Sequence, residues 1–512
     1  MVAAFGQSPK ADLSDWKPCP EFVSRLSIGF ARRHRLVGLQ HSDRLYVAIC
    51  DRAGYESIDV VTRYLKAPAE PLLATADAIE AAINAAYSGQ SSQAQQVIDS
   101  IDRDAVLSDL QNLREDLLET DGRAPIIQLV NHLLCDAVSS GASDVHIQPY
   151  EDRVVVRQRI DGVLFDSFDI PKSVQEEVLT RIKVLGKMNI AEKRLPQDGR
   201  ATVQLGDRVV DLRIASLPTS HNERIVIRLL DKSAKLYSLA QIGMPDHDYQ
   251  RFDQLIRRDH GMILVTGPTG SGKSTTLYSA LQEINSHDLN VLTLEDPIEY
   301  QLEGISQTQI NEKKGMTFAS GMRSVLRQDP DIIMVGEIRD AETAVMAIQA
   351  SLTGHLVFST LHTNDAASAV TRLLDLGIEP YLVSSSLVAS LAQRLVRRLC
   401  SSCKQSDPES ESRLPPLPPE LDSAKAVLQL SKPVGCDECR GTGFRGRIGL
   451  FELLVMDDAC RELIQTRSNA SRIREAGLGG GMRLLSTDGL LKVRQGVTTI
   501  DEVLRVTSIG GT

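Results

Sequence analysis

The sequence predicts an α/β fold with a parallel-sheet core, preceded by α+β domains and followed by a small cysteine-bearing module and C-terminal helices. Three observations predict it. A glycine-rich stretch, Gly267 to Thr275, lies between an apolar run and a helix-like run. Strand and helix patterns alternate from residue 240 to residue 396, as they do around a parallel sheet. Two C-x-x-C pairs follow that region.

Size and composition narrow the function classes. The chain has 512 residues, with 57 Lys and Arg against 67 Asp and Glu, and only 4% aromatic residues. That length suits about three or four domains. An acidic chain poor in aromatic residues is a weak candidate for binding nucleic acid. We see no apolar run long enough to span a membrane and no signal-peptide pattern at the N-terminus, so the sequence favours a cytoplasmic protein.

The region before the glycine-rich stretch divides into two domains. Residues 1–87 predict a small α/β domain, with strands at 36–39 and 44–50 and a helix from Thr75 to Tyr87. Residues 88–121 predict a polar linker and a helical pattern from Val97 to Glu119. That helix either links two domains or packs on the next one.

Residues 122–235 predict an α+β domain with helices at 124–139 and 172–187. Its expected strands lie at 144–148, 154–160, 163–168, 201–205, 209–215 and 224–230. The remaining boundaries follow from the change of pattern: a core at 236–396, a cysteine module at 397–447 and short helices over 448–512.

The glycine-rich stretch has the G-x-x-x-x-G-K-[ST] pattern of a P-loop, in the strand–loop–helix context that the motif needs. Its glycines let backbone N–H groups point at a phosphate, and the helix N-terminus adds partial positive charge. Lys273 would reach the β- and γ-phosphates, and Ser274 would ligate Mg²⁺. We expect the phosphates of a nucleotide, which the resemblance described below implies is ATP, to be held by Gly267, Pro268, Thr269, Gly270, Ser271, Gly272, Lys273, Ser274 and Thr275.

Acids and a histidine follow three later apolar strands. Glu337 follows Asp331 to Val335, with Gly336 where an Asp is usual, and its carboxylate would orient the attacking water. Another apolar run ends in acids suited to metal and water control, namely Glu295, Asp296 and Glu299. His362, at the end of a further strand, is placed like a γ-phosphate sensor, although a lone His is more often structural.

These segments together resemble the secretion ATPase superfamily of bacterial type II secretion and type IV pili, whose members are hexameric ring ATPases. The resemblance covers nearly the whole chain. Residues 194–200, Arg-Leu-Pro-Gln-Asp-Gly-Arg, are similar to a segment of the domain before the P-loop. Three others look like the type II secretion branch: Phe30 to His34, Ile190 to Lys193 and Asp488 to Gly496.

The resemblance implies a P-loop NTPase core of RecA-like architecture and roles for several residues. Glu295, Asp296 and Glu299 would form the family's "Asp box", Glu337 would be the catalytic Walker B acid and His362 the "His box" residue. Arg213 and Arg228 would be the arginines of the preceding domain that reach the nucleotide phosphates; from the residues alone, each is an ordinary charge at a strand edge. An arginine that arrives on domain closure would couple closure to phosphoryl transfer.

The paired cysteines predict a structural Zn²⁺ site with four thiolate ligands, Cys400, Cys403, Cys436 and Cys439. The gap between the pairs is long, and a proline-rich insert explains much of it. We expect the remaining cysteines to be buried small apolar residues: Cys19, Cys50, Cys135 and Cys460. Six arginines surround the module and would face anionic lipid, an acidic partner or solvent: Arg394, Arg397, Arg398, Arg440, Arg445 and Arg447.

The resemblance favours an ATP-hydrolysing motor of a type II secretion system, active as a homo-hexamer on the cytoplasmic face of the inner membrane. Residues 1–87 would bind the cytoplasmic domain of a bitopic inner-membrane protein, and a polytopic platform protein would be moved to build a pseudopilus. The alternatives are a type IV or competence pilus assembly ATPase, a DNA-translocating ring ATPase, which salt-dependent DNA binding would test, and a nucleotide-sensing scaffold without turnover.

Overall fold

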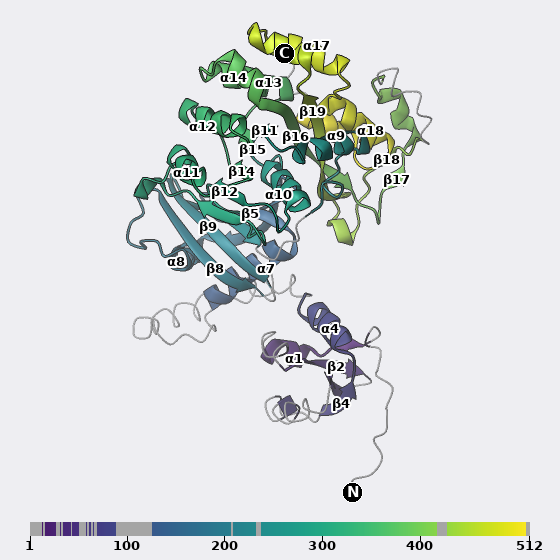
Figure 1. Ribbon diagram of the computed structural model, residues 1–512. Helices are drawn as coiled ribbons and strands as arrows, with labels where there is room; N and C mark the ends of the chain where they lie inside the picture. The colour runs from purple at the N-terminus through teal and green to yellow at the C-terminus, as the bar shows by residue number, and fades with distance from the viewer. Residues whose placement is uncertain are drawn as a thin grey trace, which may run out of the picture. The chain divides into compact units, whose positions relative to one another are not determined.

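The computed structural model describes residues 13, 16–26, 31, 34–41, 44–50, 58, 61–62, 65, 69–88, 125–205, 208–231, 237–416 and 428–507. The chain divides into two compact units, Met1–Ser233 and Ala234–Thr512, and each is described by itself (Figure 1). The expected helix from Val97 to Glu119 lies outside the described residues.

The N-terminal part of the first unit is a small sheet with helices, as predicted. Its strand order is β1-β2-β3-β4, and α4 packs Ile79 and Ile83 into the same core as the strands. Gly38 on β2 lies against α1, since a Cβ there would approach the Phe22 ring within 2.3 Å. The elements are β1 Lys17–Pro18, α1 Pro20–Arg25, β2 Leu36–His41, β3 Arg44–Ile49, β4 Ala69–Leu73 and α4 Ala76–Ser88.

The rest of the first unit has the predicted α+β pattern. Six antiparallel strands lie in the order β7-β6-β5-β10-β9-β8. Helices α7 and α8 share one apolar core with the sheet, so alternate residues of each strand face away from that core. The elements are α7 Pro125–Ser139, β5 Ala142–Pro149, β6 Arg153–Ile160, β7 Val163–Pro171, η1 Lys172–Val174, α8 Gln175–Leu185, β8 Gln197–Leu205, β9 Arg208–Thr219 and β10 Asn222–Asp231.

The second unit is built on a seven-stranded sheet in the order β13-β12-β14-β15-β11-β16-β19. The first six strands are parallel, as expected for residues 240–396. Apolar residues on one face pack against α9 and α10, and those on the other face pack against α11 to α14 and the C-terminal helices (Figure 1). The carboxyl ends of the parallel strands therefore meet at one edge of a sheet covered on both faces.

The elements of the second unit up to residue 399 are α9 Asp246–Ile256, β11 Gly261–Thr266, α10 Lys273–Ile284, β12 Val291–Glu295, β13 Ser306–Gln309, η2 Glu312–Lys314, α11 Phe318–Val325, β14 Ile332–Val335, α12 Ala341–Leu352, β15 Leu356–Leu361, α13 Ala366–Asp375, α14 Pro380–Ser386 and β16 Leu387–Leu399. After them come β17 Gln405–Ser406, η3 Pro408–Arg413, β18 Ser431–Lys432, η4 Asp437–Cys439, β19 Phe444–Val455, α16 Asp458–Gln465, α17 Ala470–Gly479, α18 Leu485–Arg494 and α19 Ile500–Thr507.

The region after residue 396 differs from the prediction of a cysteine module followed only by helices. Strand β16 continues to Leu399, and β19 pairs with it antiparallel from Phe444 to Val455. Residues 449–454 of β19 are buried on both faces, so the strand lacks the polar alternation that would reveal it in sequence. The C-terminal segment thus completes the core sheet before its four helices begin.

Candidate functional site

The P-loop joins β11 to α10 at the carboxyl edge of the sheet. All three of its glycines have positive φ, at 152° for Gly267, 79° for Gly270 and 90° for Gly272. A Cβ on Gly267 would lie 2.5 Å from the Gln393 carbonyl oxygen, and one on Gly272 would lie 2.8 Å from Gln393 Nε2. The loop is therefore shaped by its glycines and pressed against β16.

The polar groups of this loop suit a phosphate. Ser274 is exposed at the start of α10. The Ser271 hydroxyl is buried and has no hydrogen-bond partner among the described residues. The Lys273 ammonium donates to the Gly267 and Pro268 carbonyl oxygens, at 2.8 and 3.2 Å. Burial lowers the pKa of Lys273 to about 8, Glu337 opposes that shift and Arg394 adds to it. The residues present thus fit a nucleotide phosphate bound at the helix N-terminus.

Glu337 and His362 lie at the same edge. Their strands, β14 and β15, are neighbours, and β15 is also the neighbour of β11. The His362 Nε2 lies 3.2 Å from Glu337 Oε2, and Arg339 forms an ion pair with the other oxygen of that carboxylate. The Glu337 side chain is 16% exposed and that of His362 is 48% exposed. The structure therefore brings Lys273, Glu337 and His362 together.

Gly336, which stands where an Asp was expected, is held between strands. The Gly336 N–H donates to the Leu294 carbonyl at 2.8 Å, and the Thr360 hydroxyl donates to the Gly336 carbonyl at 2.7 Å. A Cβ on Gly336 would lie 3.2 Å from the Leu294 oxygen. The close packing of β12 and β14 thus favours glycine here and leaves Glu337 as the acid at the strand tip.

The three acids after β12 have different surroundings. Glu295 is 4% exposed, and its carboxylate accepts hydrogen bonds from Tyr278, Thr293 and Gln307. Burial raises the pKa of Tyr278, and the bond to Glu295 adds to that shift. Asp296 is exposed and Glu299 is half-buried. The expected control of metal and water by all three acids does not fit Glu295, whose oxygens are occupied by neighbouring side chains.

Arg213 and Arg228 lie in the first unit and are directly opposite each other on β9 and β10. Their neighbours Leu212, Ile214 and Ile227 are in the core, so the two arginines point to the other face of the sheet. Arg228 is 56% exposed, and its Nε donates to Asp144 Oδ1 at 3.0 Å. The P-loop belongs to the second unit.

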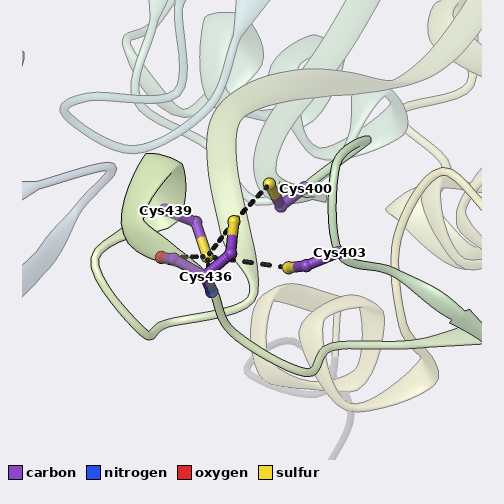
Figure 2. A group of neighbouring side chains, drawn as sticks. All are labelled: Cys400, Cys403, Cys436 and Cys439. Carbon is purple, nitrogen blue, oxygen red and sulfur yellow. Dashed lines mark hydrogen bonds between the residues drawn. The ribbon is translucent and has the colours of Figure 1, made fainter.

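Four cysteine sulfurs converge in the module after β16, as Figure 2 shows. All four ligand atoms lie within 4.8 Å of one another. Three Sγ–Sγ distances are 3.9 Å for Cys400–Cys436, 3.7 Å for Cys403–Cys439 and 3.7 Å for Cys436–Cys439. Tetrahedral Zn–S bonds of about 2.3 Å require sulfurs about 3.8 Å apart.

The same module donates N–H groups to sulfur. Gly435 N–H donates to Cys403 Sγ at 3.3 Å, and Cys436 and Gly443 N–H donate to Cys439 Sγ at 3.1 and 3.2 Å. Burial raises the pKa of Cys439, but the N–H groups of Cys436 and Gly443, together with the neighbouring Cys403 and Cys436 thiols, outweigh it and lower that pKa to about 6. Burial and the neighbouring thiols raise the pKa of Cys403 to about 11, against the Gly435 N–H. Such donors stabilise thiolates, which are the form that binds zinc.

Two predictions about the remaining side chains are wrong in part. Cys19 and Cys460 are buried as expected, whereas Cys50 is half-buried and Cys135 is exposed. Cys135 is exposed because α7 buries the face defined by Leu129, Leu133 and Ala137. Arg394 does not face a lipid or partner beside the cysteine module, since it is 8% exposed within β16.

The other basic residues near the cysteines lie at or near the surface. Arg397 forms an ion pair with Glu502 at 2.7 Å and lies over the Phe444 ring. Arg445 forms an ion pair with Glu438 at 2.8 Å. Arg398, Arg440 and Arg447 are exposed. A surface for lipid or an acidic partner therefore stays a prediction, without the buried Arg394.

Sequence reasoning missed Gln393, which is 1% exposed. Its side-chain oxygen accepts from Thr276 Oγ1 in the first turn of α10, at 2.7 Å. The signal was the pair Gln393-Arg394 within a strand whose other members from Leu387 to Val396 are apolar or small. Two polar residues at such a place indicate specific buried partners.

Comparison with known proteins identifies the family to which the chain belongs. The family model described as Type II/IV secretion system protein matches residues 119–505, and an MshEN domain model matches residues 7–93. The chain is 47% identical over 493 residues to the type II secretion system ATPase E of Vibrio cholerae, covering 95% of this chain and 97% of that one. It is 46% identical over 498 residues to the type II secretion system protein E of Pseudomonas aeruginosa, covering 94% and 96%.

Solved structures share the fold. The pilus retraction motor PilT with bound ADP matches with a TM-score of 0.50 and 26% identity, over 73% of this chain and 96% of that one. The Legionella pneumophila ATPase DotB matches with a TM-score of 0.55 and 22% identity, over 77% and 98%. Among the residues that the structure describes, none of the helices combines the length and the apolar character needed to cross a membrane.

Proposed function

The chain belongs to the type II/IV secretion system protein family, and on that premise we propose that it is the ATP-hydrolysing motor of a type II secretion system. Relatives that match nearly its whole length are named type II secretion system ATPase E and type II secretion system protein E. One observation supports the chemistry above all others: Lys273, Glu337 and His362 meet at the carboxyl edge of the parallel sheet. A P-loop lysine beside an acid and a histidine suits phosphoryl transfer from ATP to water.

The proposed roles follow from the contacts. The P-loop N–H groups and Lys273 bind the β- and γ-phosphates, and Ser274 would hold Mg²⁺, which neutralises charge on those phosphates. Glu337 orients the attacking water, and His362 contacts Glu337 from the neighbouring strand. Of the three acids of the "Asp box", Asp296 and Glu299 are the two that we propose act on metal or water. Glu295 instead holds Tyr278 and Gln307 in place.

Arg213 and Arg228 are proposed to act on the nucleotide from the first unit. Both are on the outward face of an antiparallel sheet, and Asp144 orients the Arg228 guanidinium. Delivery of two positive charges to the phosphates when the domains close would stabilise the transition state. ATP hydrolysis would then depend on domain closure, and closure is the movement that a motor transmits.

The four cysteines are proposed to hold a structural Zn²⁺. Four thiolates fill a tetrahedral shell and leave no position for substrate. The metal would fix the residues between β16 and β19, where Cys400 N–H already donates to the Gly443 carbonyl at 2.9 Å.

The partners are proposed from the family. We infer a homo-hexamer, docked by residues 1–87 on a bitopic inner-membrane protein and acting on a polytopic platform protein that builds a pseudopilus. This places the protein at the cytoplasmic face of the inner membrane. Contact of the exposed arginines near the cysteines with anionic lipid belongs to the same proposal. Turnover per molecule should rise with protein concentration if a neighbouring subunit completes the site, and turnover independent of concentration down to the monomer would contradict this.

The test is made in the host cell with Glu337→Gln and, as a matched control, Glu475→Gln on the exposed face of α17. Secreted enzymes in the medium and pili on the surface are quantified from the same cultures. Loss of secretion with pili intact, in E337Q but not in E475Q, is the expected result. Loss of pili with secretion intact would move the chain to the type IV pilus assembly ATPases. Purified protein that binds ATP without turnover when assembled would support a scaffold.

A further inference from the structure

Strand β16 lies directly against the P-loop. The Gln393 carbonyl occupies the space that a Cβ on Gly267 would need, 2.5 Å away, and the Gln393 amide borders Gly272. The same amide accepts from Thr276 in α10. A single residue of β16 therefore contacts the start of the P-loop, its end and the helix that follows.

Arg394, the next residue of β16, joins this support to the His362 loop. Its guanidinium donates to the Gln393 carbonyl at 3.3 Å and to the Asn364 carbonyl and side-chain oxygens at 3.0 and 3.1 Å. Asn364 is two residues beyond His362 and immediately precedes Asp365, the N-cap of α13. Thr363, which lies between His362 and Asn364, donates its N–H to Thr266 Oγ1 at 2.9 Å. The loop after β15 is thus held by β11 at one point and by Arg394 at the next.

The charge of Arg394 is retained inside the protein. Arginine stays protonated in proteins even when it is buried, and two acids lie close enough to act on it electrostatically, Glu452 on β19 and Asp365 on α13. Arg474 of α17 forms an ion pair with Asp365 at 3.0 Å. Burying a guanidinium is costly without such partners, and this one also donates hydrogen bonds to Gln393 and Asn364.

We propose that Arg394 is a positioning residue for ATP hydrolysis: its guanidinium fixes the loop that carries His362 to the strand that supports the P-loop. This inference rests on the proposed ATPase function and deepens it. Arg394 keeps His362 beside Glu337 while Gln393 holds the loop that binds phosphate. Loss of Arg394 should therefore harm the chemical step more than nucleotide binding.

The experiment measures steady-state ATP hydrolysis and ADP binding of the assembled full chain for the wild type, Arg394→Gln and Arg394→Lys. Loss of the charge-assisted hydrogen bonds should lower kcat of R394Q by about ten- to a hundredfold while KM for ATP and ADP affinity stay near wild type. R394K keeps the charge but not the two-pronged geometry, so it should recover part of kcat. The matched control is Arg372→Gln, an exposed arginine of α13, which should leave kcat unchanged.

Asn364→Ala removes the side-chain half of the loop contact and keeps the backbone carbonyl that also accepts from Arg394, without touching β16. It should lower kcat in the same direction, and it serves where R394Q does not fold, as judged by thermal unfolding. Wild-type kcat in N364A and in folded R394Q, or a loss confined to ADP affinity and KM, overturns the inference while the ATPase function stands. A wild-type chain that does not hydrolyse ATP when assembled overturns both.

Discussion

Replacing Glu295 and Asp296 separately should distinguish a residue that holds the fold from one that acts on the nucleotide. Glu295 is 4% exposed and accepts hydrogen bonds from three side chains, with Gln307 at 3.0 Å. Glu295→Ala leaves the hydroxyl proton of Tyr278, which is 1% exposed, without an acceptor, although the oxygen still accepts from Glu299 N–H. Leaving a buried donor without an acceptor costs about 1–3 kcal/mol, so three side chains that lose the same acceptor should together cost at least about 3 kcal/mol.

The assay is thermal unfolding of the full chain, following the transition that shifts with ADP. For a unit of this size, the expected loss corresponds to a fall in its midpoint on the order of 10 °C. Asp296→Asn removes an exposed charge and should leave that midpoint within about 1 °C while lowering kcat. The reasoning is refuted if E295A unfolds like the wild type but loses turnover, or if D296N loses as much stability as E295A.

Two further predictions concern the C-terminal part of the second unit. The purified chain should contain zinc, which a metallochromic dye detects after the thiols are modified. Cys439→Ser should lose the zinc, and Cys135→Ser, outside the four-cysteine site, should keep it. A wild-type chain without metal would contradict the site. Burial raises the pKa of Glu502, but hydrogen bonds from Arg397 and Arg505 outweigh burial and lower it from 4.5 to about 2. A depressed pKa stabilises the fold above the unfolded value and loses that contribution as pH falls toward the folded one, so Glu502→Gln should cost about 2–3 kcal/mol at neutral pH and progressively less below about pH 4. Unfolding midpoints across that range test this, and a pH-independent difference between E502Q and wild type would contradict it.

Features carried by contiguous motifs could be predicted from the sequence. The P-loop glycines, Lys273 and the two C-x-x-C pairs have fixed spacings because a short loop must surround a phosphate or a metal. Strands of the first unit were predictable because one face is buried and the other is not, which produces alternation. The proximity of Glu337 to His362 followed from parallel strands that end at one edge.

Features that depend on which strands become neighbours were not predictable. Glu295 was grouped with Asp296 because they are adjacent in sequence, yet its partners Tyr278 and Gln307 come from α10 and β13. Arg394 resembled the other arginines near the cysteines until its place in β16 put it inside the core. Cys135 was expected to be buried from its residue type, whereas the helical register of α7 places it off the apolar face.

The boundary drawn at residue 396 shows why composition alone misplaces a domain limit. Prolines and cysteines after that residue mark a change of local structure, but the sheet continues through it. Strand β16 contacts the P-loop at Gln393, forms an ion pair with α19 through Arg397 and ends beside Cys400. Strand β19 returns along its whole length, and Glu452 accepts N–H groups at the starts of α13 and α18. One strand contacts the P-loop and ends beside the cysteine module, so we expect a displacement of the module along β16 to shift the P-loop. The C-terminal segment is therefore part of the same core as the P-loop.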